Sequence, residues 1–273
     1  MARVLDVARS NLIEQLKKEK PKVPRTMKKA DDFRLLPEIL AITGSRPTYG
    51  YRRVTAMLNR ALAESGKPRV NQKRIYRIMR QNKLLLQPYG RRPSRTHDGR
   101  IITLSRNMRW CSDGFSIPCW NGDRVAVAFA LDCHDREVIS WIASTRGING
   151  AMIRDLMTES LLNRFGGALR TPHSVQWLSD NGPCYAAHET VAFGRSIGLE
   201  VCTTAPYSPE SNGMAEALVK TIKRDYVAMN DVPTATDVMS KLAGWFEDYN
   251  ERAPHKGLGM KSPREYISSI TAG

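Results

Sequence analysis

The chain has 273 residues, and its 42 Lys and Arg outnumber its 27 Asp and Glu to give a formal net charge of +15. The length predicts about two domains, and a content of 41% hydrophobic and 25% charged residues excludes a wholly disordered chain. We expect a cytoplasmic protein without membrane contact or disulfides, because no apolar run approaches the ~20 residues that span a bilayer and the five Cys include no C-x-x-C pair.

The excess positive charge is confined to the first part of the sequence. Residues 1–100 contain 25 Lys and Arg against 8 Asp and Glu, a net of +17, whereas residues 101–273 contain 17 and 19, a net of −2. A polyanion is the natural partner of such a block, because phosphates neutralised by Lys or Arg release their condensed counterions. The alternative is a basic surface that only keeps the protein in solution.

Helical periodicity dominates the first 88 residues. We expect a basic N-terminal helix and linker over 1–37, followed by a helix-turn-helix DNA-binding domain over 38–88. The predicted helices span 3–19, 31–42, 51–64 and 72–82. Asn71 is the expected N-cap of the last helix, which would read a DNA groove. The candidate DNA-contacting residues are Arg52, Arg53, Lys73, Arg74 and Arg77. A plain helical bundle with a solvated basic face is the alternative.

The periodicity of the apolar residues changes from helical to strand-like after a basic linker over 89–106, which contains Pro and Gly. The predicted strands span 108–117, 124–133, 137–145, 174–179 and 200–204, and the predicted helices span 149–165, 186–197, 209–228 and 234–251. This order predicts an α/β fold with a mixed five-stranded sheet flanked by helices. We expect this core domain to cover 107–230, with a C-terminal helix and tail over 231–273.

Three carboxylates stand where such a fold builds its sites. Asp113 interrupts the first predicted strand, Asp180 follows the fourth, and Glu216 lies on the helix after the fifth. Carboxylates that converge repel one another, and bound cations relieve this repulsion. Oxygen ligands favour Mg²⁺ or Mn²⁺. Two such ions, roughly 4 Å apart, can activate an attacking oxygen and stabilise the leaving oxygen of a phosphodiester. A single Asp after a strand is more often a turn residue.

The local sequence around these residues resembles one family closely. Asp180 and Glu216 are separated by 35 residues, as in the DDE core of transposases and retroviral-type integrases. The following segments resemble the second reading frame of insertion-sequence transposases of the IS-three family: 178–182 (LSDNG), 208–216 (SPESNGMAE), 219–224 (VKTIKR), 47–53 (PTYGYRR), 73–79 (KRIYRIM), 249–250 (YN), 254–255 (PH) and 262–264 (SPR). Segments 110–115 (WCSDGF) and 130–133 (ALDC) resemble the IS-two group most, and the resemblance covers about residues 40–268.

The resemblance implies a ribonuclease-H-like catalytic core in which Asp113, Asp180 and Glu216 are the catalytic residues and hold two Mg²⁺ or Mn²⁺ ions. It implies a DNA transposase that cleaves the 3′ ends of its element and joins them to target DNA through a circular intermediate. The implied partners are the terminal inverted repeats, target DNA, further copies of the chain on paired ends, and the upstream reading-frame product. Such chains are often made as a frameshift fusion, so we expect this one to be the downstream product alone.

Other charged residues have plainer interpretations. Glu210 would favour the dipole of a helix that Ser208 caps, and Asp132 and Asp135 would be structural or turn groups. Lys220 and Lys223 share a helix face with Glu216 and could hold DNA phosphates, although an i, i+4 ion pair is the alternative.

The five His residues show no metal-ligand spacing, so we expect no zinc-binding N-terminal module of the retroviral kind. Two other functions remain open from the sequence. A catalytically incomplete regulator would bind DNA through the basic block, and a ribonuclease-H-like nuclease would cut DNA without joining it.

Overall fold

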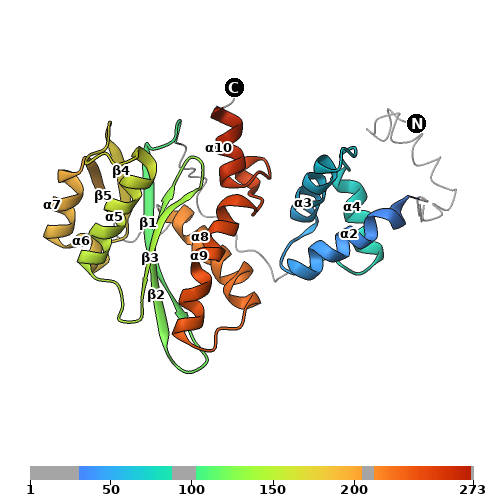
Figure 1. Cartoon of the computed structure of the whole chain (residues 1–273), viewed down its shortest axis with the longest axis horizontal. Coiled ribbons are helices and arrows are strands. Elements are labelled where there is room, and N and C mark those ends of the chain that lie inside the picture. The colour runs from blue at the N-terminus through green and yellow to red at the C-terminus, as the bar shows by residue number, and fades with distance from the viewer. Residues whose placement is uncertain (1–30, 88–102, 205–211, 272–273) are drawn as a thin grey trace, which may run out of the picture.

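The computed structural model describes residues 31–87, 103–204 and 212–271 (Figure 1). Three helices form the first domain: α2 (Asp32–Ser45), α3 (Tyr51–Glu64) and α4 (Gln72–Gln81). Their apolar faces enclose one core that includes Ile39, Leu58 and Ile75. Asn71 caps α4 as predicted, because its side chain accepts a hydrogen bond from the backbone N–H of Lys73 at 2.9 Å. The helix predicted over residues 3–19 lies outside the described residues.

The second domain contains the predicted mixed sheet. Its strands are β1 (Arg109–Pro118), β2 (Arg124–Asp132), β3 (Val138–Ser144), β4 (Val175–Ser179) and β5 (Leu199–Thr203), in the order β3-β2-β1-β4-β5. The first three strands pair antiparallel as two consecutive hairpins, whereas β4 and β5 join in parallel after helical crossovers. The predicted fold class is therefore confirmed, and β1 and β4 are neighbours near the middle of the sheet.

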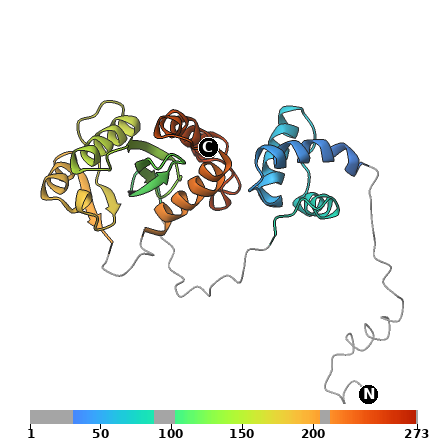
Figure 2. The same cartoon turned by 90° about the horizontal axis from the view of Figure 1, so that it is seen from below.

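Helices cover both faces of this sheet, as Figures 1 and 2 show. One face packs against α5 (Gly150–Phe165), α6 (Pro183–Ala186) and α7 (His188–Ser196). The other packs against α8 (Gly213–Asp225) and α9 (Ala235–Glu251). Trp110 and Trp177, both fully buried, lie in the core between the sheet and α5, α6 and α7. Phe129 and Ile117 lie in the core between the sheet and α8 and α9.

Two predicted helical segments differ from the structure. The helix predicted over 186–197 is two helices, α6 and α7, because Ala187 between them has an extended backbone (φ −57°, ψ 132°). The predicted tail contains the helix α10 (Pro263–Thr271) after the short helix η4 (Lys256–Leu258), and another short helix, η3 (Val227–Met229), follows α8. A capping box begins α10: Glu265 accepts from the N–H of Ser262, and Ser262 Oγ accepts from the N–H of Glu265.

Arginines of the helical domain pair with carboxylates of the second domain. Arg46 Nη1 lies 2.8 Å from Asp248 on α9, and Arg53 Nη1 lies 2.7 Å from Asp225 at the end of α8. These contacts hold the C-terminal end of α2 against α9 and the first turn of α3 against α8. Within the described residues, no helix is long and apolar enough to cross a membrane.

Candidate active site

The strand register places Asp113 and Asp180 side by side. Cys111 of β1 pairs in parallel register with Leu178 of β4, and each aspartate follows its partner by two residues. Side chains two residues apart on a strand point to the same face. Cys111, Leu178 and Phe115 all belong to the core under α8 and α9, so Asp113 faces that side of the sheet.

Glu216 reaches the same side from above the sheet. It lies in the first turn of α8, which packs on β1 through Ala215, Leu218 and Ile222. Because Glu216 directly follows the buried Ala215, its side chain lies at the rim of this contact and is 40% exposed. The three carboxylates therefore come from the middle of β1, the end of β4 and the start of α8. The predicted cap residue Ser208 and the rival Glu210 lie outside the described residues.

A buried hydrogen-bonded group joins these three elements behind the carboxylates. Ser112 Oγ and Tyr185 Oη are 2.9 Å apart, which links β1 to the short helix that follows Asp180. Asn212 Nδ2 donates to the carbonyl oxygen of Ser112 at 3.1 Å, which links β1 to the start of α8. All three side chains are buried. Ser112 thus contacts both the helix that follows Asp180 and the residue that precedes the helix of Glu216.

The electrostatics of Asp113 show that the carboxylates influence one another. Burial raises the pKa of Asp113 above its usual value, and the negative charges of Asp180 and Glu216 raise it further. The N–H of Gly114, which donates to Asp113 Oδ1 at 2.7 Å, and the charge of Lys223 lower the same pKa. The net rise shows that burial and the neighbouring carboxylates together outweigh the hydrogen bond from Gly114 and the charge of Lys223.

This donor set fits a divalent metal site. A partly buried carboxylate with two further carboxylates beside it is a suitable ligand set for a hard cation such as Mg²⁺ or Mn²⁺. Among the described residues, no three His, Cys, Asp or Glu side chains are close enough together to enclose an ion as they stand. The fit therefore rests on charge and placement, and Asp113, Asp180 and Glu216 are the residues that would hold the metal.

Lys220 and Lys223 differ in their contacts. Lys220 Nζ lies 3.1 Å from Glu216 Oε2, so the alternative i, i+4 ion pair is present in the structure. Lys223 Nζ lies 5.9 Å from the ring centre of Phe115, two residues beyond Asp113 on β1. Lys223 is exposed, and its charge acts on Asp113. Lys223 therefore stands beside the carboxylates while its ammonium group remains accessible.

The candidate DNA-contacting residues of the helical domain fall into two groups. Arg53 pairs with Asp225, and both Arg74 and Arg77 pair with Asp32 of α2, at 2.7 and 2.6 Å. Arg52 and Lys73 are exposed, and within the described residues neither forms an ion pair. The sequence did not reveal these carboxylate partners, because Arg53 and Asp225 are 172 positions apart in the chain and Arg74 and Asp32 are 42 positions apart.

Asp132 and Asp135 have the structural role that was predicted for them. Both are fully buried, and Arg164 of α5 lies 3.1 Å from Asp135 and 3.8 Å from Asp132. Asp132 also accepts from the backbone N–H of Asn107 and His134. Ser112, Tyr185 and Asn212 were not predicted from the sequence. Their only signal was proximity to Asp113, Asp180 and Glu216 in the chain.

Comparisons with known proteins agree with this fold. Models described as "Integrase core domain" match residues 104–209 and 197–263, and one described as "HTH-like domain" matches residues 30–92. The chain is 49% identical over 249 residues to the transposase InsD for insertion element IS2A/D/F/H/I/K of Escherichia coli, covering 89% of this chain and 81% of the relative. The InsD of insertion element IS2-9 from Escherichia coli K12 has the same identity and covers 89% and 80%.

One solved structure supports the fold independently of close sequence relationship. A chain of the simian T-cell lymphotropic virus intasome, solved with the PP2A regulatory subunit B56 gamma, superposes with a TM-score of 0.50. It is 19% identical, and the match covers 84% of this chain and 73% of that chain. At this identity the likeness shows a common fold.

Proposed function

The chain belongs to the IS-three family of insertion-sequence transposases, and from this membership we propose that it cleaves the 3′ ends of its element and joins them to target DNA. Asp113, Asp180 and Glu216 would be the catalytic residues. The observation that carries this proposal is the shared face of the sheet, where the β1–β4 register aligns the two aspartates and α8 brings Glu216 beside them.

The chain's own residues would prepare this site in three ways. Asp113, Asp180 and Glu216 would bind two Mg²⁺ or Mn²⁺ ions, which supply the charge that activates the attacking oxygen and stabilises the leaving oxygen. The charge of Lys223 would hold a phosphate of the strand to be cut. Ser112, through Tyr185 and Asn212, would keep the three carboxylate-bearing elements in register.

DNA binding would come mainly from the basic first hundred residues. Their net charge of +17 suits duplex DNA, and α4 would enter the major groove. The proposed substrates are the terminal inverted repeats of the element and a target duplex. We propose that copies of the chain assemble on paired ends, with the upstream reading-frame product as a further partner.

The test compares catalysis with binding in purified variants. Asp113→Asn, Asp180→Asn and Glu216→Gln should each abolish Mg²⁺-dependent cleavage and joining of a duplex that carries the element's end, while duplex affinity stays close to native. Asp123→Asn serves as the matched control, because Asp123 is exposed at the β1–β2 turn. Near-normal joining by any of the three variants would refute the assignment. Cleavage without strand transfer in the native chain would indicate a nuclease, and metal-independent binding alone would indicate a regulator.

A further inference from the structure

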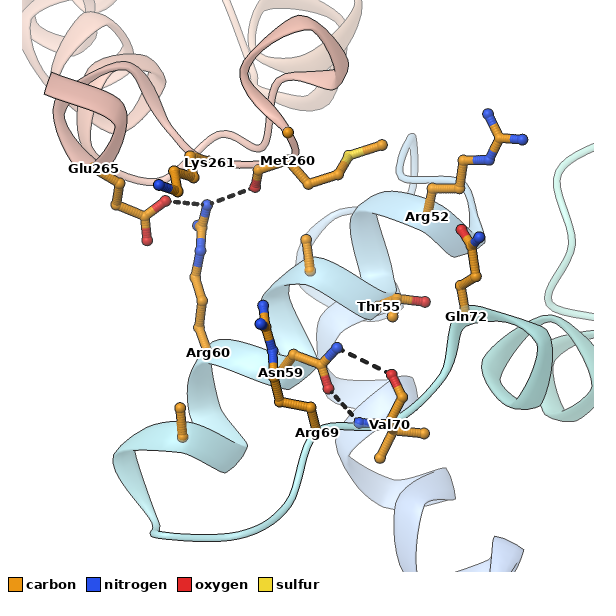
Figure 3. A pocket seen from close by; sticks show the side chains of 13 residues that line it. Arg52, Thr55, Asn59, Arg60, Arg69, Val70, Gln72, Met260, Lys261 and Glu265 are labelled. Atoms are coloured by element: carbon orange, nitrogen blue, oxygen red, sulfur yellow. Dashed lines mark hydrogen bonds and ion pairs between the residues drawn. The ribbon is translucent and has the colours of Figure 1, made fainter. Parts of the chain in front are cut away.

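A cleft of about 660 Å³ lies where the helical domain meets the C-terminal segment of the second domain (Figure 3). Its walls come from α3, from the loop and first residue of α4, and from residues 259–265. Arg52, Arg69 and Lys261 are the exposed cations of its lining, and they come from three separate stretches of the chain. Within the described residues, none of these three cations forms an ion pair with a carboxylate.

The remaining charges of the cleft fix its shape. Arg60 of α3 pairs with Glu265, and it also donates to the carbonyl oxygens of Arg252 at 2.6 Å and Met260 at 3.2 Å. As Figure 3 shows, Arg60 thereby holds the segment that carries Lys261 beside α3. Because Arg60 and Glu265 neutralise each other, the net charge of the cleft comes from Arg52, Arg69 and Lys261.

The loop before α4 is held in place as well. Asn59 donates to the carbonyl oxygen of Val70 at 3.1 Å and accepts from the N–H of Val70 at 2.7 Å. This reciprocal pair fixes the backbone next to Arg69. The first residue of α4, Gln72, completes this wall and leads into the helix that would enter the major groove. Phosphates that flank a groove-reading helix lie beside its N-terminal end, where N–H groups and cations favour negative charge.

We propose that this cleft binds the sugar-phosphate backbone of the duplex read by α4, with Lys261 of the second domain contacting the same strand as Arg52 and Arg69. The proposal rests on the DNA-binding function proposed above and adds a contact from outside the helix-turn-helix. The occupant is DNA backbone because three cations from separate segments, none of them paired with a carboxylate of the described residues, line one open cleft at the end of a groove-reading helix. DNA bound by the first domain would then be fixed directly to the second.

The experiment measures binding of the full chain to a fluorescent duplex of about 30 base pairs over a series of salt concentrations, without divalent metal. Lys261→Ala should lower the affinity up to about eightfold at 0.1 M salt and reduce the salt slope by about 1, as expected for the loss of one phosphate contact. Lys261→Arg should retain the native affinity and slope. Lys256→Ala is the matched control, since Lys256 is also an exposed lysine close by in the chain and does not line the cleft.

Several outcomes would overturn the proposal. Equal effects of Lys261→Ala and Lys256→Ala would show that only net charge matters, and an unchanged salt slope would show that no phosphate contact is lost. Thermal unfolding of each variant identifies a change that comes from misfolding, and Lys261→Gln provides a second neutral variant. If the native chain cleaves and joins DNA while Lys261→Ala binds normally, this inference fails alone. If the lysine effect is present but the chain does not cleave, the proposed catalytic function fails instead.

Discussion

Asn212 Nδ2 donates a hydrogen bond of 3.1 Å to the carbonyl oxygen of Ser112, the residue immediately before Asp113. Asn212 also precedes α8, which carries Glu216 in its first turn. One buried contact therefore sets the position of two candidate metal ligands relative to each other. Its loss would affect the distance between their carboxylates more than the charge of either.

Asn212→Ala is expected to slow cleavage and joining, by up to about 100-fold if the carboxylates shift by ~1 Å. The buried carbonyl of Ser112 loses its partner, which costs about 1–3 kcal/mol of stability. The measurement is the rate of end cleavage as a function of Mg²⁺ concentration. A higher concentration requirement with unchanged duplex affinity supports a positioning role. A lower melting temperature with an unchanged Mg²⁺ requirement would show that Asn212 is merely structural.

Tyr185→Phe and Ser112→Ala are expected to have effects that are not additive. Each removes one partner of the 2.9 Å contact between Tyr185 Oη and Ser112 Oγ, so the double variant loses nothing further there. The coupling energy should be about 0.5–1.5 kcal/mol in the free energy of unfolding, in the range of one hydrogen bond. Denaturant unfolding of the four proteins measures it. Strictly additive losses would mean that the two hydroxyl groups do not interact.

Lys223→Ala is expected to lower the rate of cleavage and joining without weakening metal binding, because its exposed ammonium lies beside the carboxylates but is bonded to none of them. A flexible point charge can position a phosphate without reading sequence. Lys223→Arg, which keeps the charge, should retain most of the rate. Single-turnover kinetics on a pre-nicked end would show the difference. Unchanged joining rates in Lys223→Ala would restrict this residue to packing against Phe115.

The stability of the chain is expected to fall as the pH drops below about 6.5, in part through His255. Burial lowers the pKa of His255 to about 3, and the charges of Arg53, Arg136 and Arg60 act in the same direction. Below the usual His pKa, the unfolded chain binds a proton that the folded chain does not, so the free energy of unfolding decreases by up to about 1.4 kcal/mol per pH unit. Above about pH 6.5 neither state of the chain binds this proton, so the free energy of unfolding no longer changes with pH through His255.

Melting temperatures between pH 8 and pH 5 provide the measurement, with His255→Gln as the comparison. The variant should lose less stability than the native chain over the acidic part of this range, because Gln does not titrate. Parallel curves for the two proteins would mean that His255 becomes protonated in the folded state too.

The order of strands and helices could be predicted because each element has its own periodicity. Strand β1 lies within one residue of its predicted bounds at each end, and α3 begins and ends at the predicted residues, Tyr51 and Glu64. The placement of Asp113 beside Asp180 depends on the parallel pairing of β1 with β4, two strands that are distant in the chain, and the sequence indicated it only through the family resemblance. The helix α10 had a local signal, the capping box of Ser262 and Glu265, that the prediction did not use.

Contacts between distant segments could not be predicted in the same way. Ser112 has the appearance of any small strand residue, and nothing near it in the chain indicates Tyr185 or Asn212 as partners. Likewise, Arg53 belongs to a strongly basic block, and its local sequence favours DNA contact over the ion pair with Asp225. Such pairings depend on three-dimensional packing. Neither secondary-structure propensity nor the charge pattern of the sequence indicates which distant segments pack together.

Helix α8 has Glu216 in its first turn and Asp225, the partner of Arg53, at its last residue. Nine residues of α-helix span about 14 Å along the axis, and a short helix packed on a sheet does not stretch. The distance between the contact with the helical domain and the proposed catalytic Glu216 is therefore a fixed length of the protein. Inserting one residue into α8 would rotate Glu216 by about 100° relative to Asp225.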